Sequence, residues 1–453
     1  GGYGPDGGEP GFYRERGLRA LPVDGPLAVA VPGAMGTVAA LHRAAATRPL
    51  AELWAPAIAA AAQGVPCTTK TRGDVVELEE RLSQDAGLAE VFLPGGRPPR
   101  VGEPVVHADL AATLRTLAAD PGAMYRGALS ERAVAALRSA GAPFSGEEWA
   151  LAEQVSGRPA LTGSYRGHAV HQTPPPTPGW MVLQQAGICD GVLAGLPWLD
   201  AEAVHWLASA ARIAFTDRYD GCGDANDHWR ALLTPESLAS RRDRISAGEP
   251  LPGAPALRAG DTTSMAVADG DGWAVSIINS LAFTFGARIS VPGTGITLNN
   301  RLGRGAYLVD GHPNEVRPRR RPLHTLNAWM ITDASGRLRH VGNTPGGDGQ
   351  VQWNTQVISH LLDHGADPAT AVAAPRFTVF PGSDADVIGQ PPQLRAESRL
   401  GPQRLAALSD LGHDVRDLGP WGAGGAMEVI SIDPNGSLQG ASDPRQDGTA
   451  LGH

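Results

Sequence analysis

Apolar residues recur with a helical period through much of the first half of the chain. The period is clearest over 106–160, about 201–216 and 233–245, where apolar positions three and four residues apart predict amphipathic helices. A short apolar run at Leu27–Val31 has no such period, and it predicts a strand. The first half is therefore expected to be mainly helical with few strands.

The second half alternates apolar and polar residues, which predicts strands, with two later helices near 350–364 and 400–412. The alternation is clearest in Ser264–Ala268 and Trp273–Ile278, which flank the Asp-Gly turn Asp269–Gly272. Two alternating runs around such a turn predict a β-hairpin. Helices followed by strands indicate either two domains or two halves of one layered α/β fold.

Between the two halves, residues 246–261 are rich in Pro, Gly and Ala and have no sustained period, so they predict an exposed linker. Thr262 follows this linker and opens the hairpin. A threonine hydroxyl is a weak nucleophile, but cleavage of the preceding bond would free an α-amine on the same residue to act as its base. Thr263 is the neighbouring alternative, because β-branched residues are common in strands.

Composition narrows the classes of function. The 453 residues are 42% hydrophobic and 19% charged, as in a soluble globular protein, and the net charge of −9 argues against nucleic acid as a partner. The cluster Arg317–Arg321 indicates a solvated loop, with a local anion site as the alternative. The histidines, including His168 and His171, form no ligand set with metal spacing, so neither a metal site nor another cofactor is expected.

Location is predicted from the cysteines and from the length of apolar runs. Cys67, Cys189 and Cys222 are widely spaced, which favours a reducing, cytoplasmic compartment. No apolar run has the length of a membrane span, so no membrane partner is expected. The chain begins with Gly1 rather than Met, and secretion therefore stays open.

Several short segments, read together and in order, match a pattern found in one known family. The segments are Val31–Gly33, Tyr165–Gly167, Pro174–Pro176, Ala214–Arg218, Asp261–Thr262, Ala274–Ile277, Phe285–Gly286, Pro292–Asn300, Arg321–Thr325, Pro345–Gly347 and Ala374–Phe377. Together they resemble the γ-glutamyltransferase family of N-terminal-nucleophile (Ntn) hydrolases. A further segment, Gly311–Asn314, and the pair His324–Thr325 are more similar to the branch called γ-glutamyltransferase-like.

The resemblance implies a four-layer αββα sandwich formed jointly by two halves of one precursor. It implies self-cleavage between Asp261 and Thr262 into a large fragment, 1–261, and a small catalytic fragment, 262–453, that stay associated. The opening elements of the family are expected to be missing before residue 1. A homo-oligomer of the resulting heterodimer is left open.

The same resemblance assigns roles to four residues. Thr262 matches the nucleophile, and Ser280 matches a hydroxyl residue that assists it by hydrogen bonding. Gly346 and Gly347 match two glycines whose amide N–H groups form an oxyanion hole, which stabilises developing negative charge.

At the substrate-binding positions the sequence departs from the family pattern. Arg301 and Arg304 fall where the family has the glutamine and aspartate that hold a glutamyl α-ammonium group. His324 and Thr325 replace two serines that help to hold the α-carboxylate, and Asn300 is assigned to substrate binding with them. Guanidinium groups accept no hydrogen bond and would repel an ammonium group. The departures therefore predict an anionic small-molecule substrate rather than an ordinary γ-glutamyl donor.

Three hypotheses remain open. The first is an Ntn hydrolase acting on an anionic acyl group, such as an oxalyl-like or dicarboxylate group, or on a keto acid. By analogy with branch members in antibiotic biosynthesis, it includes hydrolysis of a C–C bond. The second is a conventional γ-glutamyl hydrolase or transferase with a rebuilt pocket. The third is an inert binding relative, which the joint retention of Thr262, Ser280 and the two glycines disfavours.

Overall fold

The computed structural model describes residues 2–221, 223–224, 226–248, 262–380 and 392–452. The chain forms two compact units. Unit 1 comprises Gly1–Arg158 with Leu281–Pro322, and unit 2 comprises Pro159–Ser280 with Leu323–His453. Each unit contains chain from both sides of the predicted cleavage position. Asp261 and most of the predicted linker lie outside the described residues.

Unit 1 is mainly helical, as the periodicity predicts, and its aromatic core includes Phe144 and the fully buried Trp149. Its strands are short pairs, β1 with β2 and β7 with β8. The elements are α1 (Pro10–Arg14), α2 (Ala34–Ala45), α3 (Leu50–Leu53), α4 (Ala55–Gln63), β1 (Val65–Pro66), α5 (Thr69–Glu77), α6 (Glu79–Leu82), α7 (Ala86–Phe92), β2 (Pro104–Val105), α8 (Ala108–Ala119), α9 (Gly127–Ser139), α10 (Glu147–Leu151), β7 (Ser290–Val291), β8 (Ile296–Thr297) and α15 (Arg301–Gly305).

The predicted strand at Leu27–Val31 is wrong. Residues Pro26–Ala28 form a 3₁₀ turn, Val29 is extended, and residues 29–31 belong to no strand. The amide of Val31 donates to the Tyr3 carbonyl at 2.9 Å, and that of Ala30 to the Asn299 side chain at 3.3 Å. The run is apolar because it is buried, and its backbone N–H groups are satisfied by separate hydrogen bonds rather than by a strand partner. An apolar run of this kind has the same sequence pattern as a buried strand, so the pattern could not distinguish the two.

Unit 2 is built from sheets covered by helices. Each of the four helices predicted in this unit is present, with ends within about five residues of the predicted ones. Thr234 caps one of them, α14, through its side chain. The elements are β3 (Leu161–Tyr165), β4 (His168–Gln172), α11 (Gly179–Cys189), α12 (Ala201–Gly221), α13 (Trp229–Leu232), α14 (Pro235–Ser246), β5 (Thr262–Ala268), β6 (Ala274–Ser280), β9 (Ala328–Thr332), β10 (Leu338–Asn343), α16 (Gly349–Leu362), α17 (Pro368–Ala373), β11 (Phe377–Phe380), β12 (Gln393–Ala396), α18 (Pro402–Asp410), β13 (Val415–Asp417), β14 (Glu428–Ile432) and β15 (Leu438–Ser442).

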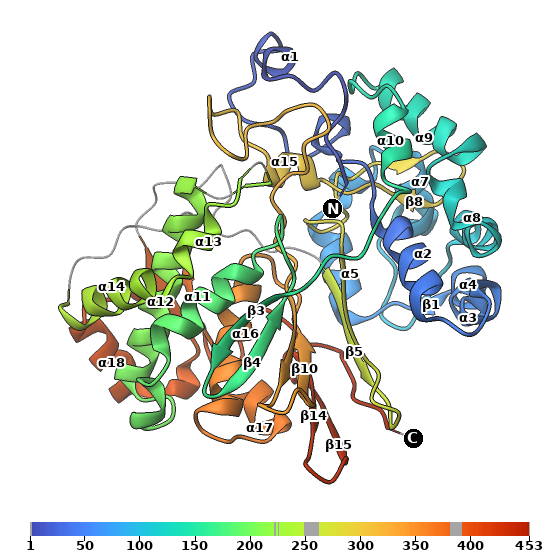
Figure 1. Cartoon of the computed structure of the whole chain (residues 1–453). Coiled ribbons are helices and arrows are strands. Elements are labelled where there is room, and N and C mark those ends of the chain that lie inside the picture. The colour runs from blue at the N-terminus through green and yellow to red at the C-terminus, as the bar shows by residue number, and fades with distance from the viewer. Residues whose placement is uncertain (1, 222, 225, 249–261, 381–391, 453) are drawn as a thin grey trace. The chain divides into compact units, whose positions relative to one another are not determined.

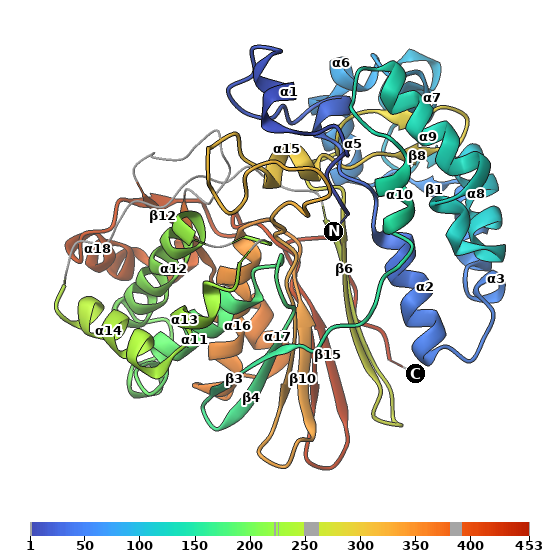
Figure 2. The ribbon, with the colours of Figure 1, turned by 45° about the horizontal axis from the view of Figure 1, so that its top comes forward.

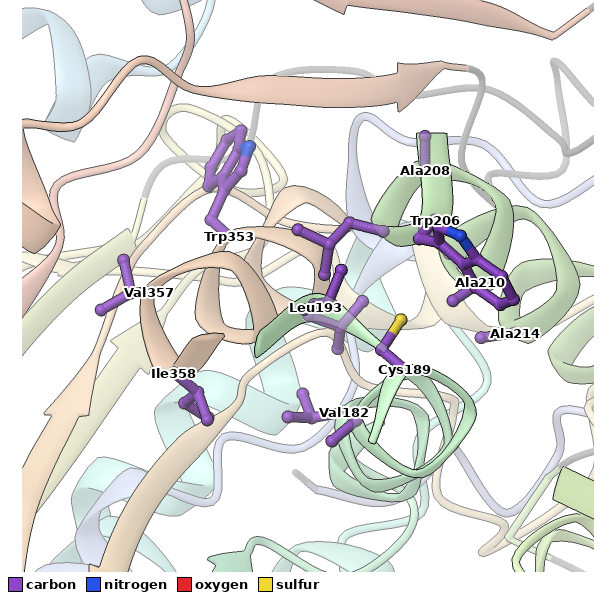
Figure 3. Close-up of a cluster of buried hydrophobic side chains, with 14 of the residues drawn as sticks. Val182, Cys189, Leu193, Trp206, Ala208, Ala210, Ala214, Trp353, Val357 and Ile358 are labelled. Carbon is purple, nitrogen blue, oxygen red and sulfur yellow. The ribbon is translucent and has the colours of Figure 1, made fainter. Parts of the chain in front are cut away.

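The main sheet of unit 2 has six antiparallel strands in the order β15-β14-β10-β9-β4-β3 (Figure 2). Successive side chains of a strand point to opposite faces. One face carries Val170, Ile331 and Val429, which belong to the same buried cluster as residues of α11, α12 and α16. Figure 3 shows part of this cluster, with Val182 and Cys189 of α11 near the helix that carries Ile358.

The opposite face of the sheet carries Asn343 and Glu428, which are register partners on β10 and β14. Both hydrogen-bond to the hairpin β5–β6. Helices, six-stranded sheet and hairpin are therefore successive layers of unit 2 (Figure 1). They match three successive layers of the predicted αββα arrangement.

The β5–β6 hairpin is confirmed, and its turn follows from local chemistry. The Asp269 carboxylate accepts hydrogen bonds from the amides of Asp271 at 3.0 Å and Trp273 at 2.9 Å, which closes the turn. The pairing is continuous from Ala268 opposite Ala274 to Thr262 opposite Ser280. Burial alternates strictly along both strands, so one face is partly buried and the other is exposed.

Candidate active site

Thr262 and Ser280 lie directly opposite each other at the open end of the hairpin. The Thr262 hydroxyl donates to the Ser280 hydroxyl at 2.9 Å, within ordinary hydrogen-bond range. Thr262 is half-buried, whereas Thr263 points to the other face and is exposed. Strand alternation thus separates the two candidate nucleophiles, and only Thr262 has the partner that the sequence predicts.

The hairpin is held on the main sheet by Asn343, a residue that the sequence analysis missed. Its side-chain amide donates to the carbonyls of Met265 on β5 at 2.9 Å and Ile277 on β6 at 3.3 Å, and to the Ser276 hydroxyl at 2.7 Å. Asn343 is fully buried. Because it ends β10 just before Thr344, it connects the strand of the candidate nucleophile to the turn that contains Gly346 and Gly347. Its position before Pro345–Gly347 was the available sequence signal.

Glu428 is a second residue that the sequence analysis missed. Its carboxyl group bonds to the hydroxyl of Ser264, which lies two residues beyond Thr262 on the same face of β5. Burial raises the pKa of Glu428 to about 7, and the nearby Asp443 carboxylate adds to this shift. A carboxyl group that is still about half protonated at neutral pH therefore contacts β5, the strand that begins with the candidate nucleophile. No local pattern marks it, because β14 is more than 160 residues away along the chain.

Gly346 and Gly347 form a tight turn between β10 and α16. Their φ angles are +123° and +58°, a region that favours glycine. The carbonyls of both residues accept hydrogen bonds from the first turn of α16, from Gly349 at 3.0 Å and Gln350 at 3.2 Å. Within the described chain, neither the Gly346 nor the Gly347 amide N–H donates a hydrogen bond. This geometry is suited to an oxyanion hole, whose assignment here stays a prediction.

The residue after these glycines is fixed by a buried ion pair. Asp348 and Arg218 are 2.5 Å apart, and both side chains are almost fully buried. Arg218 ends the segment Ala214–Arg218 on α12 and thereby links this helix to the start of α16. Breaking such a pair leaves an uncompensated buried charge, so it fixes the position of the turn strongly.

In unit 1, the two predicted substrate-binding arginines both lie on the short helix α15. Arg301 and Arg304 are each only 4% exposed, which excludes an arrangement in which both point to solvent. The Arg304 guanidinium lies over the Phe283 ring at 4.7 Å and donates to the Ala282 carbonyl at 3.3 Å. Their role in binding substrate stays a prediction.

Asn300, also in unit 1, has its side-chain amide engaged by backbone. Its carbonyl oxygen accepts from the Phe283 amide at 3.0 Å, and its nitrogen donates to the Val23 carbonyl at 2.8 Å. The residue is fully buried at the start of α15. These contacts give Asn300 a role in positioning α15, and its predicted contact with substrate is not tested by them.

His324 and Thr325 belong to unit 2, where both are buried. The His324 amide donates to the Pro176 carbonyl at 3.0 Å, so this segment is fastened to the proline run after β4. Among the residues that the structure describes, no group of three or more His, Cys, Asp or Glu side chains is arranged to hold a metal ion. In that same part of the chain, no helix is long and apolar enough to cross a membrane.

The sequence profile of the family described as gamma-glutamyltranspeptidase matches residues 3–453, almost the whole chain. The chain belongs to this family. It is 33% identical over 452 residues to an oxamate amidohydrolase proenzyme from Klebsiella pneumoniae, covering 96% of this chain and 83% of that protein. It is 31% identical to a glutathione hydrolase-like proenzyme, YwrD, from Bacillus subtilis, with coverage of 96% and 83%.

Among solved structures, the chain is similar to a cephalosporin acylase from Bacillus halodurans, with a TM-score of 0.87 and 29% identity. That alignment covers 100% of this chain and 84% of the other. The α/β fold class of the Ntn hydrolases is thereby confirmed, and the protein is an enzyme of the hydrolase class.

Proposed function

We propose that the enzyme hydrolyses amides whose acyl group carries a free carboxylate, with oxamate as the first candidate substrate. The observation that carries the proposal is the 2.9 Å hydrogen bond from the Thr262 hydroxyl to Ser280, at the start of a strand whose N-terminal residue can become a free amine. Support for the substrate class comes from the arginines at positions 301 and 304 and from the similarity to an oxamate amidohydrolase.

Self-cleavage before Thr262 would supply the catalytic base. A free α-amine has a reference pKa near 8, so a useful fraction is neutral at pH 7. It can take the proton from the Thr262 hydroxyl as the oxygen attacks the amide carbon, while Ser280 orients that oxygen. The amide N–H groups of Gly346 and Gly347 would bind the resulting oxyanion.

Collapse of this intermediate would break the C–N bond. The leaving nitrogen takes the proton from the α-ammonium group and departs as ammonia, leaving an ester on Thr262. Water, deprotonated by the α-amine, then attacks the ester and releases the dicarboxylate. With oxamate, the products are ammonia and oxalate, and the hydroxyl and the amine of Thr262 return to their starting states.

Charge distinguishes this proposal from conventional γ-glutamyl hydrolysis. A γ-glutamyl donor brings an ammonium group, whereas oxamate brings only a carboxylate. At an effective dielectric constant of 20, like charges about 4 Å apart cost on the order of 4 kcal/mol. A cost of that size corresponds to roughly three orders of magnitude in affinity and is enough to change the substrate class.

The test incubates the purified, self-cleaved enzyme with oxamate, glutaramate, a γ-glutamyl anilide and a 2-keto acid. Products are identified by mass spectrometry, and ammonia release is followed in parallel. We expect turnover of the two anionic amides, slow or no turnover of the anilide, and no activity in Thr262→Ala. Efficient turnover of the anilide alone would support the conventional alternative, and a protein that neither cleaves itself nor turns over any substrate would support the inert one.

A further inference from the structure

Trp353 occupies an unusual place in the core of unit 2. It lies in the second turn of α16 and is only 5% exposed. In Figure 3 its indole ring points away from the other labelled side chains of the cluster, whereas Trp206 lies next to Ala210 inside it. The family resemblance assigns no role to either tryptophan. The orientation of the Trp353 indole is explained by its contacts outside the cluster.

Those contacts are with glycines. A methyl group added to Gly346 would lie 2.1 Å from the indole ring, and one added to Gly349 would lie 2.4 Å from it. The loop before β14 approaches the same ring, since added methyl groups on Gly424 and Gly425 would lie at 3.0 and 2.7 Å. Four glycines from two segments therefore lie against the indole. At three of them, Gly346, Gly349 and Gly425, an added methyl group would come closer to the ring than side-chain atoms normally do.

The indole is itself fixed in place by polar contacts. Its N–H donates to the Thr378 hydroxyl on β11 at 2.8 Å. The Arg376 guanidinium lies 5.4 Å from the ring centroid and donates to the Gly424 carbonyl at 2.8 Å. One arginine thus contacts the indole and also holds the second glycine segment.

Arg376 is in turn part of a buried network of charges. It bonds to Asp443 at 2.5 Å, and Arg445 bonds to Asp443 at 3.0 Å and to Glu397 at 2.7 Å. The side chains of these four residues are at most 3% exposed. A fully paired network in a region of low dielectric is rigid, so Arg376 is held in a fixed position against the indole.

We propose that Trp353 is a positioning residue for the oxyanion turn, defined as Thr344–Gly349. Its ring holds the backbone of Gly346 in the position from which the amide N–H groups of the two glycines meet a developing oxyanion. The inference rests on the proposed function in so far as the turn binds an oxyanion. Because such donors act through preorganised geometry, a displacement of the turn should lower kcat more than it weakens substrate binding.

The experiment compares Trp353→Phe and Trp353→Ala with Trp206→Phe. Trp206 is a matched control, because it is a buried tryptophan of the same cluster and has no part in the proposed chemistry. Two quantities are measured on each self-cleaved enzyme. The first is kcat and KM for the substrate that the wild type hydrolyses best. The second is hydrogen–deuterium exchange in peptides that cover the oxyanion turn.

We expect Trp353→Phe to lower kcat about 10-fold and Trp353→Ala about 100-fold, with KM changed less than about 3-fold. Exchange should rise in the oxyanion turn of both variants and stay at the wild-type rate there in Trp206→Phe. The inference is overturned if Trp353→Ala keeps wild-type kcat, or if the Trp206 variant loses as much kcat with the same rise in exchange.

Failure of the proposed function would give a different result. A wild-type enzyme that hydrolyses none of the amides refutes that function, but the exchange measurement still decides whether Trp353 holds the turn. Faster exchange limited to the turn in the Trp353 variants supports the positioning role. Unchanged exchange overturns it.

Discussion

The β5–β6 hairpin of unit 2 and helix α15 of unit 1 position polar groups in different ways. On the hairpin, the hydroxyls of Thr262 and Ser280 are partly buried and bond to each other, and the strands around them are held by Asn343. On α15, two guanidinium groups are almost fully buried on a helix of five residues. A neutral hydroxyl pair costs little to bury, whereas a buried cation costs several kcal/mol unless it is compensated.

This difference agrees with the prediction that the hairpin carries the chemistry and α15 the substrate specificity. The hydroxyl pair, like the glycine turn, fits a reaction that the whole family can share. The two positive charges on α15, in contrast, lie where the sequence departs from the family pattern. Variants that alter one region and leave the other intact can test whether the two functions are separable.

The largest expected effect is in Thr262→Ala, which should abolish both self-cleavage and turnover. Thr262 is the residue that would carry the nucleophile and its base together, and it bonds to Ser280. Thr263→Ala is the matched control, because Thr263 points to the exposed face of the same strand. N-terminal sequencing of the small fragment should begin at Thr262 in the wild type. Equal losses in both variants would contradict the assignment.

Gly346→Ala should lower kcat by about 100-fold or more, as loss of an oxyanion donor does in other enzymes. The new methyl group would meet the Trp353 ring at 2.1 Å, at a φ of +123° that alanine rarely adopts. Gly336→Ala is the control, since its φ is also positive but no atom lies within 4 Å of the new methyl group. If both variants lose kcat equally, backbone strain rather than the turn is responsible.

Arg301→Gln combined with Arg304→Asp should lower kcat/KM for an anionic amide by about 100-fold or more and improve turnover of a γ-glutamyl anilide. The reason is the lost charge-assisted hydrogen bonds, which contribute about 1.5–3 kcal/mol each. The double lysine variant keeps both charges and serves as the control. Circular dichroism melting checks that α15 still folds, because both arginines are buried. Unchanged selectivity in a folded double variant would show that α15 does not select the substrate.

Glu428→Gln should have the smallest effect, a change in how stability depends on pH. The pKa of Glu428 is raised from 4.5 to about 7 by burial, so between these values the folded protein keeps a proton that the unfolded chain has lost. Wild-type stability should therefore fall as pH rises from about 4.5 to 7. Below this window Glu428 is protonated in both the folded and the unfolded state, so it does not lower the stability. Urea midpoints measured at pH 5 and 7.5 should show that the variant becomes more stable relative to wild type at the higher pH.

The control for this measurement is Glu131→Gln, a change at an exposed position of α9. Its difference from wild type should stay constant between the two pH values. A Glu428→Gln variant that behaved in the same way would mean that the carboxyl group behind the nucleophile strand is ionised in the folded enzyme.

Local sequence was sufficient for the hairpin. Alternation and the Asp269 turn predict the strands, and a strict two-residue period places Thr262 and Thr263 on opposite faces. The same reasoning failed at Leu27–Val31, because an apolar run indicates burial without indicating a strand partner. The strand prediction failed because the backbone hydrogen bonds of this run are made with distant residues such as Tyr3 and Asn299, which a local pattern does not show.

The sequence by itself determined the family, the candidate nucleophile and the charge at the predicted substrate-binding positions, since each depends on residue identity within a short segment. Only the tertiary structure decided what supports them. Asn343 fastens the hairpin, Glu428 lies behind the nucleophile strand, and Trp353 lies against the oxyanion turn. These contacts join strands and helices far apart in sequence, and their strength comes from burial and exact packing, which exist only after the chain has folded.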